Sequence, residues 1–106
     1  MQTKTEKVLN IKVKFFSELC FNLKENIEPN ETIIVKLSYP FTIAHLIEIL
    51  EIQFPSLSSV IRDSNSNYVN YLGIVVNGRD FCHISNFKRI LKDNDQVTFM
   101  YLGVGG

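Results

Sequence analysis

The 106-residue sequence predicts an α+β fold, a mixed β-sheet with one main helix across one face. Three features indicate it: alternating apolar residues at positions 8–16, a helical apolar stripe at 42–54, and an apolar strand at 97–102. Hydrophobic residues make up 45% of the chain, which is enough for one compact core. We therefore expect a single domain over residues 1–106, with residues 1–7 frayed.

The first predicted element is a strand with one buried face. Apolar side chains occupy every second position there: Leu9, Ile11, Val13 and Phe15. A polar stretch containing Asn26, Pro29 and Asn30 predicts a turn, and residues 32–37 predict a second strand. The two strands are expected to form a hairpin with a rather long loop.

A helix is predicted next, from Thr42 as its N-cap to about Phe54, where Pro55 ends it. Its apolar side chains fall within one arc of the helical wheel: Ile43, Leu46, Ile47, Leu50 and Phe54. Ile52 lies opposite this arc and is expected to be exposed. A short second turn, begun by Ser56, is expected to hold residues 57–61.

Residues 63–70 read as a polar loop, and the remaining strands follow it. We expect strands at 72–77 and 97–102, with a short edge strand at 81–84 and a 3₁₀ or helical turn at 87–91 between them. Asn94 is expected to adopt a left-handed conformation in the turn before the last strand. The crossover helix lets the last strand lie parallel to the first, which gives a β-grasp layout.

Several classes of function are disfavoured by composition. Eleven basic residues balance eleven acidic ones, so nothing predicts direct binding to nucleic acid or to a membrane surface. The sequence shows no secretion signal and no membrane-spanning run, so a cytoplasmic location is expected. Cys20 and Cys82 are expected to be reduced, and His45 to be a surface residue. No CxxC, HxxxH or GxSxG pattern occurs, so we expect no metal site, bound cofactor or nucleophilic enzyme site.

The end of the sequence carries the strongest functional signal. Three of the five glycines fall in the last four residues, directly after the last predicted strand. We expect a flexible tail in which Gly103, Val104 and Gly105 enter a narrow channel of a partner, because glycine lacks the Cβ that would block it. The reactive group of such a tail is the carboxylate of Gly106. A carboxylate is a poor electrophile, so an enzyme must activate it, for example by adenylation with ATP.

A second expected site is an apolar patch on the sheet face away from the helix. Phe16, Thr98 and Met100 should lie there on neighbouring strands, with Leu102 beside the tail, and should dock a partner. The alternative is that residues 17–30 fold over this patch and bury it. Lys12, Lys14 and Lys36 form a basic strip across the first hairpin, which could attract an acidic groove of that partner.

The segment 74–106 resembles the C-terminal half of the ubiquitin-like sulfur-carrier family. The matching features are Val76-Asn77-Gly78, the 91–97 stretch LKDNDQV and an apolar strand that ends in Gly105-Gly106, while the 11–16 stretch IKVKFF is similar to the family's first strand. This family includes the small subunit of molybdopterin synthase, the thiamine-pathway sulfur carrier, the ubiquitin-related modifier and the small archaeal modifiers.

The resemblance implies a carrier that other enzymes act upon. An activating enzyme, using ATP and Mg, would adenylate Gly106, and a thiocarboxylate would then form. Sulfur would pass to an acceptor enzyme, such as a molybdopterin synthase large subunit or a tRNA thiolase. Two alternatives remain open: a protein modifier joined through Gly106 to substrate lysines, and an interaction domain whose tail is inert.

Overall fold

The computed structural model describes residues 7–102. Within this range the elements are β1 Leu9–Phe15, α1 Ser17–Phe21, β2 Ile33–Leu37, α2 Ile43–Gln53, α3 Leu57–Ile61, β3 Leu72–Val76, β4 Asp80–Cys82, the 3₁₀ helix η1 Ile84–Asn86 and β5 Gln96–Tyr101. The expected frayed N-terminus, apart from Lys7, and the expected tail at 103–106 lie outside the described residues. No helix within residues 7–102 is long and apolar enough to cross a membrane.

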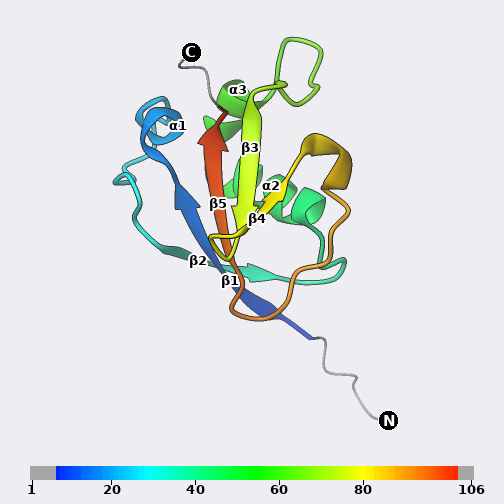
Figure 1. Cartoon of the computed structure of the whole chain (residues 1–106). Coiled ribbons are helices and arrows are strands. Elements are labelled where there is room, and N and C mark those ends of the chain that lie inside the picture. The colour runs from blue at the N-terminus through cyan, green and yellow to red at the C-terminus, as the bar shows by residue number, and fades with distance from the viewer. Residues whose placement is uncertain (1–6, 103–106) are drawn as a thin grey trace.

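The strands form one mixed sheet in the order β2-β1-β5-β3-β4 (Figure 1). β1 and β5 are parallel, with Val13 opposite Val97, and the other neighbouring strands are antiparallel. Asn94 has a φ of 69°, so the turn before β5 uses the left-handed conformation that the sequence predicts. The α+β prediction, the β-grasp topology and the parallel central pair are therefore confirmed.

The helix α2 packs across one face of this sheet, and in Figure 1 it lies behind the strands. Four of its predicted core side chains are fully buried: Ile43, Leu46, Ile47 and Leu50. Phe54 is half-buried at the C-cap, and Ile52 is 81% exposed, as the helical wheel predicts. The sheet contributes the other half of the core through Ile11, Val13, Ile74, Val76 and Phe99. In Figure 1, no helix of residues 7–102 lies over the opposite face of the sheet.

The N-cap of α2 provides a test of how its first turn is held. The Thr42 hydroxyl accepts a hydrogen bond from the backbone N–H of His45 at 3.1 Å. Replacing Thr42 with Ala leaves that N–H without its partner, so we expect the free energy of unfolding to fall by about 1 kcal/mol. Chemical denaturation measures this change, and Thr42→Ser, which keeps the hydroxyl, is the matched control. Equal losses in both variants would contradict the capping role.

Two segments differ from the sequence prediction. The loop between β1 and β2 contains the one-turn helix α1, which buries Leu19 and Cys20. A helix of five residues is too short to show a helical period of apolar residues, so the sequence does not predict α1. The helical turn predicted at 87–91 is wrong: η1 precedes it. Residues 87–91 instead run beside the start of α2, where Leu91 N–H donates to Phe41 O at 2.7 Å.

The long loop after α1 is tied to α3 through Glu25 and Ser56. The carboxylate of Glu25 accepts from the Ser56 hydroxyl and from its backbone N–H, the latter at 3.2 Å. The hydroxyl of Ser56 accepts in turn from the backbone N–H of Lys24 at 2.9 Å. The hydrogen bond from Ser56 favours the charged carboxylate and lowers the pKa of Glu25 below its ordinary value of 4.5.

This tether predicts a pH dependence of stability. A carboxyl whose pKa is lower in the folded state adds stability above its unfolded pKa, and this is lost as the pH falls through the folded value. We therefore expect Ser56→Ala to flatten the decline in melting temperature below pH 4.5 compared with the unsubstituted chain. Melting temperatures measured between pH 3 and 6 test this expectation, because ordinary glutamate side chains titrate within this range. Parallel pH curves for the two proteins would show that the tether adds nothing.

The candidate docking face and the base of the C-terminal segment

The sheet face away from α2 carries an apolar patch across three strands. The strand period points five residues of β3, β4 and β5 to this face, of which Gly73 is buried beneath its neighbours and the others are half-buried or exposed: Gly73, Val75, Phe81, Thr98 and Met100. The register brings them together, because Val75 lies opposite both Thr98 and Phe81, and Gly73 lies opposite Met100. Thr98 and Met100 are half-buried, and Phe81 is 49% exposed. We call these five residues, with Phe16 and Leu102, the open face.

Phe16 reaches this region from a different element than predicted. β1 ends at Phe15, and Phe16 is the N-cap of α1 rather than a strand residue. Its backbone N–H donates to Phe99 O at 2.8 Å, which keeps it beside β5. The Phe16 side chain is 46% exposed, so the segment that follows it does not bury it. Of the two arrangements that the sequence left open, the structure has the uncovered one.

A basic strip borders the open face on β1 and β2. Lys12 and Lys36 are exposed, and Lys14 lies directly opposite Thr98 in the parallel β1–β5 ladder. Lys36 Nζ donates to the Asn10 side chain at 3.0 Å. A partner that covers both halves of this surface therefore needs an apolar contact area next to acidic side chains.

The base of the C-terminal segment is held by Tyr101. Its hydroxyl donates to Val60 O in α3 at 3.2 Å and accepts from the Asn22 side chain at 3.4 Å. Its ring makes an edge contact with Tyr71, with the ring centroids 5.1 Å apart. Burial raises the pKa of Tyr101, so the hydroxyl stays neutral and keeps its proton for Val60. One residue further on, Leu102 N–H donates to Tyr71 O at 2.6 Å.

Gly103, Val104, Gly105 and Gly106, predicted to carry the chemistry, lie outside the described residues. The structure places Thr98 and Met100 on β5, Leu102 directly after it, and Phe16 beside it through the hydrogen bond to Phe99 O. Sequence reasoning did not assign Tyr71, Gly73, Val75 or Phe81 to this site. The period of the 72–76 strand separates its two faces, but the pairing of Val75 with Phe81 depends on a three-residue turn whose register the sequence left open.

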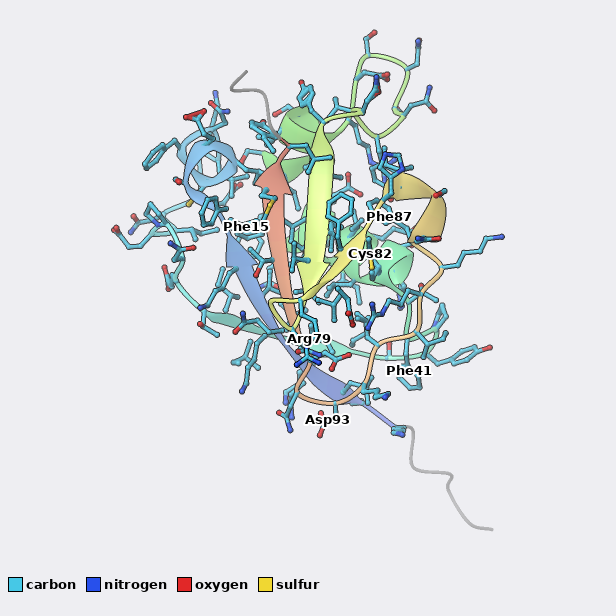
Figure 2. The ribbon with its side chains drawn as sticks, viewed as in Figure 1. Phe15, Phe41, Arg79, Cys82, Phe87 and Asp93 are labelled. Atoms are coloured by element: carbon cyan, nitrogen blue, oxygen red, sulfur yellow. The ribbon has the colours of Figure 1, made fainter. Side chains whose placement is uncertain are left out.

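Within the part of the chain that the structure describes, the cysteine and histidine candidates form no second site. Cys20 and Cys82 are buried free thiols, and burial raises the pKa of the Cys20 thiol. Cys82 is the last residue of β4 and is labelled in Figure 2, and Arg89 Nη1 donates to its Sγ at 3.7 Å. His45 is half-buried, with Nδ1 2.8 Å from Pro40 O. Among residues 7–102, no three His, Cys, Asp or Glu side chains come together where they could hold a metal ion.

An open depression lies where α2 and α3 meet the loop at 63–66, and the arginine that lines it is already paired within the fold. Arg62 pairs with both oxygens of the Glu51 carboxylate, at 2.6 Å and 3.0 Å, and stacks on Tyr68. The ion pair raises the pKa of Arg62. The other lining residues are Ser58, Ser59, Asp63, Ser64 and Ser66. We assign it a structural role, since its arginine is already bound on two sides.

Comparison with solved structures shows the same fold. SAMP1 from Haloferax volcanii superposes with a TM-score of 0.72 at 15% identity, covering 92% of this chain and 99% of that one. Small archaeal modifier protein 1 from Methanosarcina acetivorans gives 0.66 at 22%, covering 94% and 99%. Urm1 from Trypanosoma brucei gives 0.58 at 16%, covering 96% and 100%. No protein-family model and no curated protein sequence matches the chain. These likenesses establish the β-grasp fold.

Proposed function

We propose that the chain is a ubiquitin-like sulfur carrier that reacts through the carboxylate of Gly106. The observation that carries the proposal is the position of the Gly-Gly pair. Three residues separate it from the end of β5, the central strand of the sheet, and Met100 and Leu102 of the open face lie at that end. A partner that grips the open face thus lies beside the segment that bears the reacting group.

The chemistry has two steps, and the partner supplies ATP and Mg. A Gly106 carboxylate oxygen attacks the α-phosphorus of ATP, which forms an acyl-adenylate and releases pyrophosphate. Hydrosulfide then attacks the carbonyl carbon, AMP leaves, and a thiocarboxylate remains. Within residues 7–102 the chain offers no metal-binding cluster, so the positive charge that stabilises the phosphoryl transfer is assigned to the partner.

The docking surface of the activating enzyme follows from the open face and the basic strip. We infer an apolar contact area for Phe81, Met100 and Leu102, flanked by carboxylates that face Lys12 and Lys14. The sulfur acceptor, a molybdopterin synthase large subunit or a tRNA thiolase in the family that the sequence resembles, would use the same face in turn. Successive use of one face requires that the activating enzyme dissociate first.

The second candidate is a protein modifier, and it is supported by the names of two structural neighbours, which are called small archaeal modifier protein 1. Its chemistry shares the acyl-adenylate and differs in the nucleophile. A lysine amine then takes the place of hydrosulfide, AMP leaves, and an isopeptide bond forms. The fold serves both outcomes, so the reaction product must distinguish them.

The test begins with the intact mass of the protein purified from its own host, which shows whether Gly106 is the last residue. The protein is then incubated with the host's adenylating enzyme, ATP and sulfide. Replacement of one oxygen by sulfur at Gly106 supports the carrier. Addition of the chain to lysines of other proteins supports the modifier. If no adenylate forms, the segment is inert and the chain is an interaction domain.

A further inference from the structure

Gly73 occupies a position in the sheet where a glycine is unexpected. It lies within β3, between the fully buried Leu72 and Ile74, on a strand paired on both sides. Glycine weakens a strand interior, because it loses more backbone entropy on folding and packs no side chain. Among the described residues, positive φ values occur at Gly78 and four non-glycine residues but not at Gly73. The backbone conformation of Gly73 therefore does not require glycine.

The close packing above Gly73 explains why this position holds a glycine. A Cβ at this position would lie 2.6 Å from Leu102 Cδ2, 3.0 Å from Leu102 Cγ and 3.3 Å from Phe81 Cε1. Cβ atoms in real proteins essentially never come closer than 3.0 Å to such neighbours. Two side chains thus meet over the bare backbone of β3, one from β4 and one from the residue that follows β5.

Leu102 is also the residue from which the C-terminal segment departs. β5 ends at Tyr101, and the hydrogen bond from Leu102 N–H to Tyr71 O holds one further residue against the chain that enters β3. The side chain of Leu102 adds a second attachment to β3 through the gap over Gly73. Backbone and side chain of Leu102 are therefore both fixed to the neighbouring strand.

We propose that Gly73 is a positioning residue: its missing side chain lets Leu102 close over β3 and fixes the position of Leu102, the residue that precedes 103–106 in the sequence. The inference rests on the proposed function, in which Gly106 must reach a partner's nucleotide. Four residues span at most about 14 Å, so the position of Leu102 limits the region that the reacting carboxylate can reach. A displacement of about 1 Å at a reacting group can lower a rate on the order of a hundredfold.

Gly73→Ala separates this role from a structural one. The new methyl group displaces only the end of a flexible leucine side chain. Alanine also loses less conformational entropy on folding than glycine, so we expect an unchanged or higher melting temperature. Hydrogen exchange at the Leu102 amide should accelerate at least tenfold, while exchange at the Phe99 amide stays unchanged. In adenylation assays, kcat should fall more than KM rises, by roughly tenfold or more.

A double-mutant cycle with Leu102→Ala tests whether the effect of Gly73→Ala on kcat acts through the Leu102 side chain. Without the leucine side chain, the methyl group at position 73 has nothing to displace at the end of β5. Gly73→Ala should therefore cost no further kcat in the Leu102→Ala background. An equal loss of kcat in both backgrounds would overturn the proposal, because the methyl group would then act through Phe81 or on the partner directly.

The exchange measurement uses the free full-length chain, so it separates this inference from the proposed function. Unchanged protection at Leu102 in Gly73→Ala overturns the positioning role, even where adenylation of the unsubstituted chain proceeds. Faster exchange at Leu102 in a chain that no adenylating enzyme modifies supports the anchoring of Leu102 and overturns the proposed function alone.

Discussion

Deletion of Gly106 is expected to reduce ATP–pyrophosphate exchange by the activating enzyme to the background rate. The carboxylate then sits on Gly105, one residue short, and a loss of about 3.5 Å of reach places it outside attacking distance of the α-phosphorus. Addition of one alanine after Gly106 should have the same effect. The melting temperature should not change in either variant, because neither change removes a contact among residues 7–102.

Gly105→Val tests the steric part of the same argument. A β-branched side chain should block a channel that admits glycine alone, while the length of the segment stays correct. One alanine added before Met1 is the matched control, since it lengthens the chain at the other terminus. Exchange at the unsubstituted rate in the deletion variant, or background exchange in the control, would contradict the assignment of Gly106.

The core and its topology follow from local patterns that are strong in this sequence. Alternation in 9–15 and the stripe in 43–54 each define one buried face, and burying both leaves few ways to order the strands. The N-cap Thr42, the left-handed Asn94 and the exposed Ile52 were predictable for the same reason: each depends on its own neighbours in the chain.

The parts of the site that the sequence did not reveal depend on contacts between distant segments. Nothing in the neighbouring sequence explains a glycine at position 73, and the reason becomes visible only when Leu102, 29 positions later, is placed over it. Phe16 was predicted as a strand residue because the apolar run continues through it, whereas α1 begins directly afterwards to bury Leu19 and Cys20. In the fold, the chain turns into α1 and buries these two side chains instead of extending β1 by one more residue. The alternation within one strand does not indicate which of these two arrangements is more stable.

Met100→Glu is expected to weaken binding of the activating enzyme by roughly tenfold or more, the effect typical of a charge placed within a desolvated contact area. Met100 lies on the open face, opposite Gly73 and one residue before the end of β5, and it is half-buried, so a glutamate there keeps contact with water in the free chain. Its carboxylate would lose that water in the complex and would face the acidic side chains that we infer on the partner. Titration calorimetry with purified enzyme measures the change.

Ile52→Glu is the matched control, because it places the same charge on an 81% exposed apolar residue of α2, on the other side of the sheet. We expect its dissociation constant to equal that of the unsubstituted chain. Phe16→Asp extends the test: Asp is a favourable N-cap, and Phe16 holds that position in α1 without a side-chain hydrogen bond. Phe16→Asp should therefore bind more weakly without a lower melting temperature. A sharp fall in the melting temperature of Met100→Glu would identify Met100 as a core residue, and equal binding by Met100→Glu and Ile52→Glu would place the docking surface elsewhere on the molecule.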